Sequence, residues 1–172
     1  MTQYVALLRN IGPVTHARMA LGTLAERCVE AGLSDVANIG NTGNLVFSSE
    51  QTQAAVGAVV GEAVKSFEVN AEVFTRTRRQ WQMLVSLAPF PEAAADHPAR
   101  LGVCFFHKDP RWPEVYRKHA GPERLQMFSN HLIVDYGKEG SVARLTIERT
   151  VGARMTQRNW SSVLRIAQKL GL

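Results

Sequence analysis

A β-hairpin is encoded in the first third of the chain by Val36-Ala-Asn-Ile-Gly40-Asn-Thr-Gly-Asn44-Leu-Val-Phe-Ser48. Two strand-like runs, 36–39 and 44–48, flank the turn Gly40-Asn-Thr-Gly43, whose composition is typical of hairpins. A phosphate-binding glycine loop would instead lead into the N-terminus of a helix, where free backbone N–H groups attract anions. Because these glycines lead into a strand, we interpret the turn as structural.

Further strands and helices are expected on both sides of this hairpin. The hydrophobic spacing predicts a strand over 3–9, a helix from 21 that ends at Gly32, a second helix over 51–67 and a strand over 69–75. The resulting order, β-α-β-β-α-β, is that of the ferredoxin-like arrangement, in which helices cover one face of the sheet.

The second half of the chain predicts a similar order of elements. A helix over 78–87 and a connection rich in proline and alanine over 89–99 precede it. The expected elements are then a strand at 101–107, a helix at 113–119, strands at 125–128 and 131–135, and helices at 141–151 and 157–170. We therefore predict an α+β fold of two ferredoxin-like halves, a degenerate duplication, with a C-terminal helix. The predicted domain bounds are 1–77, a linking helix and loop at 78–99, and 100–172.

Length and composition are those of a compact globular protein. The chain has 172 residues, of which 45% are hydrophobic and 20% charged. No apolar run approaches the roughly 20 residues that span a bilayer, and no secretory signal precedes the first strand. We therefore expect a cytoplasmic protein that does not enter a membrane. Cys28 and Cys104 lack the paired spacing of a zinc or redox site, so both are predicted to be reduced core residues, and we expect no metal and no cofactor.

The formal net charge of +5 is unevenly distributed along the sequence. Residues 1–70 contain four basic and six acidic side chains, whereas residues 71–172 contain sixteen and nine. The last 24 residues, 149–172, contain five basic side chains and no acidic one. This asymmetry favours an anionic partner, and a basic surface that only solvates the protein is the alternative.

Three segments carry a resemblance that extends over most of the chain. They are Tyr4-Val-Ala-Leu-Leu-Arg9-Asn10-Ile11, Gly43-Asn44-Leu-Val-Phe47-Ser48-Ser49 and Thr156-Gln-Arg158-Asn159-Trp160-Ser-Ser-Val163. With these segments the sequence resembles domain-of-unknown-function family 1697, a group of uncharacterised small bacterial proteins. The resemblance implies a mixed fold built of ferredoxin-like pieces and implies no known activity.

The sequence departs from that family in the loop after the first strand. Family members have glycine-isoleucine-asparagine-valine-glycine-glycine there, whereas this chain has Asn10-Ile-Gly-Pro-Val-Thr-His16. In the hairpin turn, Thr42 replaces the usual serine. If the family loop binds a ligand through its backbone, this chain has lost or altered that function.

The candidate ligand-binding residues are Arg9, Asn10, Asn44, Arg158, Asn159 and Trp160. Arg9 and Asn10 leave the first strand and would face the same surface as Asn44 if the first and third strands are neighbours. The other three lie at the expected start of the last helix, where an arginine and free N–H groups bind anions. Trp160 also fits the apolar stripe of that helix, and Asn159 also fits a capping role. No catalytic residues are identified.

Three hypotheses for the function follow. The first, which the charge asymmetry favours, is a binding protein for nucleic acid or another polyanion. The second is an enzyme or binder that acts on a small phosphorylated or carboxylated metabolite at the candidate residues. The third is a protein-interaction module without chemistry. The sequence contains no catalytic constellation that separates an enzyme from a binding protein.

Overall fold

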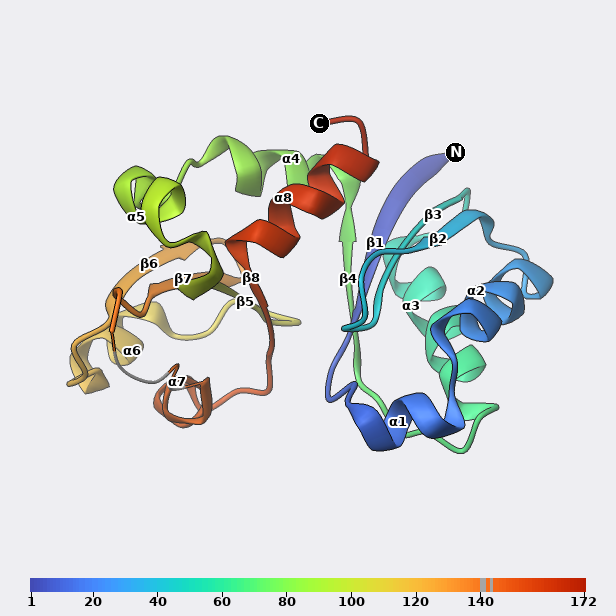
Figure 1. Cartoon of the computed structure of the whole chain (residues 1–172), viewed down its shortest axis with the longest axis horizontal. Coiled ribbons are helices and arrows are strands. Elements are labelled where there is room, and N and C mark those ends of the chain that lie inside the picture. Colours follow the sequence, from blue (N-terminus) through green and yellow to red (C-terminus); the bar gives the residue numbers. More distant parts are fainter. Residues whose placement is uncertain (140–141, 143) are drawn as a thin grey trace. The chain divides into compact units, whose positions relative to one another are not determined.

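The computed structural model describes residues 1–139, 142 and 144–172, and its elements form two compact units (Figure 1). Unit 1 comprises Met1–Met83 and Arg165–Leu172, and unit 2 comprises Leu84–Leu164. The divisions fall inside two helices, α4 (Arg78–Ser86) and α8 (Trp160–Lys169). The domain bounds 1–77, 78–99 and 100–172 stay a prediction, because compact packing and independent folding are separate properties.

Unit 1 contains a four-stranded antiparallel sheet in the order β2-β3-β1-β4. Its strands are β1 (Thr2–Leu8), β2 (Ser34–Asn38), β3 (Asn44–Ser49) and β4 (Val73–Thr77). Val5 in the central strand pairs with Val46 of β3 and Arg76 of β4. The backbone N–H of Ile39 donates to the carbonyl of Asn44 at 2.8 Å, and so closes the predicted hairpin of β2 and β3. The predicted ferredoxin-like order is confirmed for this half.

Two helices of unit 1, α2 (Leu21–Glu30) and α3 (Gln53–Lys65), cover one face of this sheet (Figure 1). The Thr52 hydroxyl caps α3 by accepting from the backbone N–H of Ala55 at 3.3 Å. A further short helix, α1 (Pro13–Arg18), lies where the sequence predicted only a loop. Its first residue, Pro13, suits a helix start, because the missing N–H would have no partner inside the helix.

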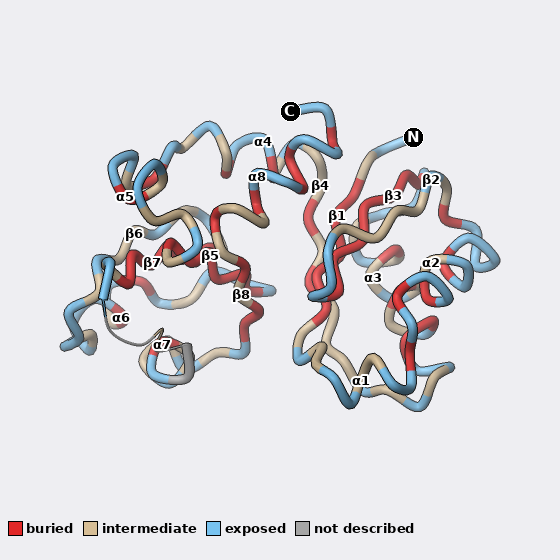
Figure 2. Tube along the Cα trace, viewed as in Figure 1, coloured by how far each residue is buried: buried red, intermediate tan, exposed pale blue. Residues whose placement is uncertain are grey.

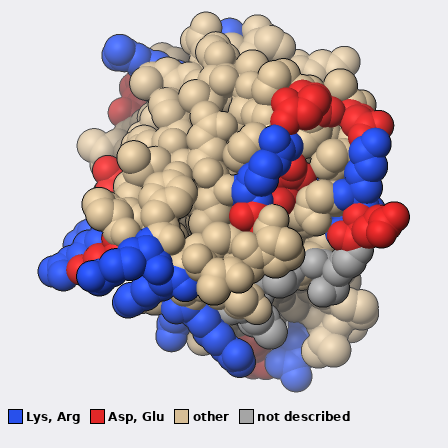
Figure 3. All heavy atoms as spheres, turned by 90° about the vertical axis from the view of Figure 1, so that its left-hand side faces the viewer, with Lys and Arg blue, Asp and Glu red and all other residues tan. Residues whose placement is uncertain are grey.

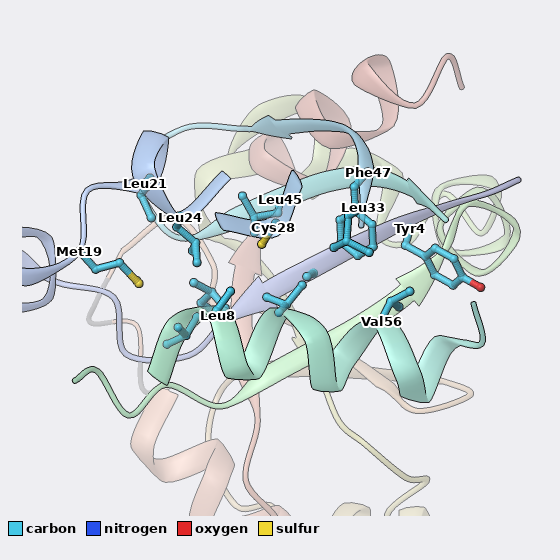
Figure 4. Close-up of a cluster of buried hydrophobic side chains, with 14 residues drawn as sticks. Tyr4, Leu8, Met19, Leu21, Leu24, Cys28, Leu33, Leu45, Phe47 and Val56 are labelled. Atoms are coloured by element: carbon cyan, nitrogen blue, oxygen red, sulfur yellow. The ribbon is translucent and has the colours of Figure 1, made fainter. Parts of the chain in front are cut away.

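Alternate residues of the strands build the core between sheet and helices. Tyr4 and Leu8 of β1 and Leu45 and Phe47 of β3 point toward α3 and α2 in Figure 4. The rings of Tyr4 and Phe47 stack with their centroids 5.9 Å apart. Phe47 is 1% exposed, and burial of a side chain of this size contributes about 2 kcal/mol. The alternation along the strands therefore fixes which sheet face carries the helices.

Unit 2 repeats this sheet in the order β6-β7-β5-β8. Its strands are β5 (Leu101–Phe105), β6 (Arg124–Phe128), β7 (His131–Asp135) and β8 (Thr156–Asn159), and all neighbours are antiparallel. The fourth strand corrects the sequence analysis, which placed residues 157–159 in the last helix. Pairing with β5 supplies the backbone hydrogen bonds of β8, so tertiary context overrides the helical pattern that begins at Trp160. The duplication is thus complete, with β-α-β-β-α-β in both halves.

The helices of unit 2 include two short ones in the segment predicted as a connection, 89–99. They are α5 (Pro91–Asp96) and the 3-10 helix η1 (Pro98–Arg100). The other two are α6 (Trp112–Lys118) and α7 (Arg144–Val151), which pack against each other over one sheet face. The helix at 141–151 was predicted to include residues 141 and 143, which lie outside the described residues.

Burial follows the same pattern in the two units. In Figure 2 buried residues run along β1 and β3 of unit 1 and along β5 and β7 of unit 2, while exposed residues lie on helix surfaces and turns. Cys28 and Cys104 are both free and 0% exposed, which confirms that they are core residues. Across the part of the chain that the structure describes, no helix combines the length and hydropathy needed to cross a bilayer.

Candidate functional site

The structure brings the first three candidate residues to one end of the unit 1 sheet. Strands β1 and β3 are neighbours, as the hypothesis required, and Asn44 pairs with Leu7. Asn44 is 2% exposed, and its amide donates to the carbonyl of Ile39 at 2.9 Å and to the hydroxyl of Thr42 at 3.1 Å. These bonds make Asn44 a residue that holds the hairpin turn.

The segment after β1 packs against the same turn. The backbone N–H of Arg9 donates to the backbone carbonyl of Glu72 at 2.9 Å, and the carbonyl of Asn10 accepts from the Thr15 hydroxyl at 3.2 Å. Asn10 has a positive φ of 62°, a conformation that asparagine tolerates better than most residues. Gly43 approaches this segment so closely that a Cβ there would lie 2.7 Å from Cγ1 of Ile11. The loop and the turn therefore form one packed structure.

The second group of candidates lies in unit 2 and is largely buried. Arg158 is in strand β8, not at a helix start, and is 7% exposed. Its Nη1 donates to the hydroxyl of Thr156 at 2.8 Å and to the carbonyl of Gln157 at 2.9 Å. The Asn159 side chain accepts from the N–H of Ser162 at 2.9 Å and so caps α8, while Trp160 is 4% exposed. These contacts support capping for Asn159 and core packing for Trp160.

The six candidates are therefore divided between the two units, three in each. The assignment of these residues as ligand-binding stays a prediction. Their described contacts are with the protein itself.

A network of charged side chains lies around Asp135 at the end of β7. Asp135 is 4% exposed and accepts from His97 Nε2 at 3.0 Å, Arg124 Nε at 2.9 Å and the backbone N–H of Gly137 at 2.9 Å. Arg124 also pairs with Glu92 at 2.7 Å and lies 4.7 Å from the ring centroid of Phe90. A buried carboxylate that accepts hydrogen bonds from three residues is stable in the ionised form.

The network shifts the pKa values of its members. Burial alone would raise the pKa of Asp135, but the bonds from Gly137, Arg124 and His97 outweigh it and hold that pKa below its usual range. The bond to Asp135 raises the pKa of His97, with a second contribution from Asp96. Both ring nitrogens of His97 face carboxylates, since Nδ1 lies 3.2 Å from Asp96 Oδ2. An imidazole held in this way stabilises charge and has no free nitrogen for proton transfer.

Basic side chains gather on another part of unit 2. Figure 3 shows red and blue side chains alternating on one side of this face and mostly blue ones gathered at the lower left. In α6 and the segment before it, exposed basic residues occur at 108, 111, 117 and 118, accompanied in sequence by Asp109 and Glu114. We name Lys108, Arg111, Arg117 and Lys118 the α6 basic surface.

The orientation of α6 explains why these side chains face outward. Trp112 and Val115, three residues apart, are buried on the sheet side, and the indole N–H of Trp112 donates to Ser129 at 3.1 Å. Arg117 and Lys118 are exposed, and neither has an ion pair among the described residues. Arg111 is the exception, with Nη1 at 3.4 Å from Glu114. Exposed cations without acidic partners can bind phosphate groups.

The charge asymmetry is smaller when it is counted by compact unit. Unit 1 contains nine basic and seven acidic side chains, and unit 2 contains eleven and eight. The basic residues 76, 78, 79, 165 and 169 belong to unit 1 although they lie in the second part of the sequence. Three of the eight acidic side chains of unit 2, Glu92, Asp96 and Asp135, are paired within the network.

A polar hollow of about 440 Å³ lies beside the hairpin turn of unit 1. It is lined by His16, Ala20, Leu21, Asn38 and Asn41. His16 Nε2 donates to the carbonyl of Asn41 at 2.8 Å, and the side-chain oxygen of Asn38 is buried without a hydrogen-bond partner among the described residues. Arg165 borders the turn, with Nη1 3.7 Å from the position of a Cβ at Gly40. No group of residues suited to a metal ion occurs in the described ranges.

Residues 1–132 match the family described as protein of unknown function (DUF1697). The chain belongs to this family. A solved structure of a conserved bacterial protein from Streptococcus pneumoniae is similar over 100% of this chain and 99% of its own, with a TM-score of 0.70 and 17% sequence identity. At that identity the likeness shows the shared fold alone. No curated protein matches the sequence.

The matched region of this DUF1697 chain includes α6, which contains none of the six candidate residues predicted from the sequence. The helix itself was predicted, over 113–119. Its buried positions 112 and 115 were the available signal, because they leave 117 and 118 on the solvent side of a helix. The uneven charge along the sequence instead favoured residues 149–172 as the region for an anionic partner, but Arg158 in that region is buried.

Proposed function

We propose that this protein binds a phosphate-bearing polyanion through the α6 basic surface. The observation that carries the proposal is the group of four outward-facing basic side chains between 108 and 118, three of which have no acidic partner among the described residues. Each cation that contacts a phosphate releases condensed counterions, so such a surface gains affinity without a deep pocket.

The position of the cations on their helix agrees with this role. Arg117 and Lys118 lie in the last turn of α6, where a positive charge also favours the helix dipole. Folding therefore tolerates these charges at little cost, and their side chains extend into solvent. The acidic side chains of the Asp135 network are held by partners of their own.

A charge-reversal variant tests the proposal. Arg117→Glu combined with Lys118→Glu should weaken binding of inorganic polyphosphate and of oligonucleotides about tenfold or more at moderate salt. The matched control is Arg27→Glu combined with Lys65→Glu, which makes the same change in net charge on exposed residues of unit 1. Fluorescence anisotropy measures both. Equal weakening in the two variants would show an effect of net charge and contradict the proposed surface.

A second candidate function is binding of a small phosphorylated or carboxylated metabolite in the hollow beside the unit 1 hairpin. His16, Asn38 and Asn41 supply polar groups around a volume of about 440 Å³, which is suited to a small ligand. Inorganic phosphate or citrate should then raise the thermal midpoint, and His16→Ala should abolish the rise. An unchanged rise would remove His16 from the site.

A further inference from the structure

Two large apolar side chains are exposed next to the α6 basic surface. Tyr116 of α6 is 40% exposed and Met127 of β6 is 49% exposed. Both belong to unit 2, whose other large apolar side chains in α6, Trp112 and Val115, are buried. We name these two partly exposed side chains the apolar platform of unit 2.

A hydrogen bond joins the side chain of Tyr116 to the backbone of Met127. The backbone N–H of Met127 donates to the phenolic oxygen of Tyr116 at 2.9 Å. The ring of Tyr116 is thereby fixed at its outer end as well as at its Cα, so stacking on it costs little side-chain entropy. Strand β6 is an edge of the unit 2 sheet, and the same bond satisfies one of its outward N–H groups.

The tyrosine ring and one of the cations are neighbours on the same helix. Arg117 follows Tyr116 directly and is exposed like it, about 100° further round the helix axis. Surfaces that combine an aromatic face with a track of cations bind unpaired bases and the backbone phosphates between them. Polyphosphate has no bases, and the bases of a duplex are already stacked, so neither makes use of an exposed ring.

We propose that the polyanion is a single-stranded nucleic acid, one base of which stacks on Tyr116 while a neighbouring phosphate binds Arg117. The inference rests on the proposed function of the α6 basic surface and adds the class of partner. Charge complementarity accounts for the backbone contacts, and the fixed ring accounts for a preference for unpaired bases.

Variants of Tyr116 separate stacking from the support of strand β6. Tyr116→Phe keeps the ring and removes the oxygen that accepts from Met127. Tyr116→Leu removes both the ring and the oxygen, and Tyr116→Trp keeps a ring of larger area. Each variant is compared by thermal midpoint first, and each is then titrated with oligo-deoxythymidine, a duplex of equal charge and inorganic polyphosphate.

The expected result is selective. Tyr116→Leu weakens oligo-deoxythymidine binding about tenfold, Tyr116→Phe and Tyr116→Trp retain it, and polyphosphate and duplex binding are unchanged in all three variants. If Tyr116→Leu leaves the single strand unaffected, or weakens all three polymers equally, the stacking inference is wrong while the basic surface stands. If the unmodified protein binds none of the polymers, the proposed function itself is wrong.

Discussion

Arg158 on β8 lies opposite Val103 in the same way as Arg76 on β4 lies opposite Val5. Each arginine is on the last strand of its half and pairs with the central strand. Both are buried, at 2% exposure for Arg76 and 7% for Arg158, and each donates from Nη1 to a backbone carbonyl of the preceding residue. This equivalence is evidence for the duplication at the level of single residues, and it indicates a structural role for Arg158.

Arg158→Ala should therefore destabilise unit 2. The variant removes the donor to Thr156 and Gln157 and leaves space in a buried position, so we expect the free energy of unfolding to fall by about 2 kcal/mol. Arg154→Ala, an exposed position four residues earlier, should change it by less than about 0.5 kcal/mol. Urea denaturation measures both. A stable Arg158→Ala protein that no longer binds polyanions would restore Arg158 as a ligand residue.

Two glycine substitutions should have opposite effects on stability. Gly43→Ala places a Cβ 2.7 Å from Ile11 and 2.8 Å from Leu8 at a φ of +70°, so it should destabilise the protein by more than about 1 kcal/mol. Gly61→Ala, in the interior of α3 with no atom within 4 Å of the new Cβ, should stabilise it by up to about 1 kcal/mol. Thermal or urea denaturation provides the comparison. A neutral Gly43→Ala would mean that the loop after β1 does not pack on the turn as described.

The bond between His97 and Asp135 predicts a dependence of stability on pH. The pKa of His97 is raised above its ordinary 6.5, so protonated His97 contributes stability that is fully present below 6.5 and is lost as pH rises through the raised pKa. Asp96 and Asp135 face the ring, Arg124 holds the other oxygen of Asp135, and Lys138 pairs with Asp96 at 2.6 Å. The advantage of the unmodified protein over His97→Gln should therefore shrink as pH rises from 6.5 through the raised pKa of His97.

Titration of the His97 ring protons by NMR measures the shift directly. A midpoint at or below 6.5 would contradict the arrangement around Asp135. The lowered pKa of Asp135 acts at the other end of the range, because its contribution is present above the ordinary value of 3.8 and is lost on acidification through the lowered pKa.

The cysteines should be unreactive in the folded protein. Burial raises the pKa of the Cys28 thiol to about 11, so the reactive thiolate is scarce at neutral pH. Cys28 and Cys104 are both 0% exposed, and the thiol of Cys104 donates to the side-chain oxygen of Gln157 at 3.5 Å. A thiol reagent should therefore modify both only when denaturant unfolds the protein. Rapid modification without denaturant would mean that one of the two units opens readily.

The elements that the sequence predicted are those with strong hydrophobic periodicity. Both halves were recognised because the hairpins at 36–48 and 125–135 and the amphipathic helices carry local signals. Strand β8 was missed because Thr156-Gln-Arg-Asn159 has little strand propensity, and only pairing with β5 makes it a strand. Helices α1 and α5 were missed because each has only six residues, too few to show a helical period.

The candidate site was less predictable, because burial of a charged side chain depends on tertiary structure. The motif containing Arg158, Asn159 and Trp160 is the most specific in the sequence. In the structure, however, Arg158 bonds the strand backbone, Asn159 caps α8 and Trp160 packs in the core. Arg117 and Lys118 belong to no motif, and their exposure follows from the burial of Trp112 and Val115.

The salt dependence of binding tests the central claim most directly. For a labelled single-stranded oligonucleotide, the slope of log Kd against log salt reports the number of phosphates bound, at about 0.7 per contact. Arg117→Ala combined with Lys118→Ala should reduce that slope by about 1.4, and Arg27→Ala combined with Lys65→Ala should leave it unchanged. An unchanged slope in the α6 variant, or binding that does not depend on salt, would contradict polyanion binding at this surface.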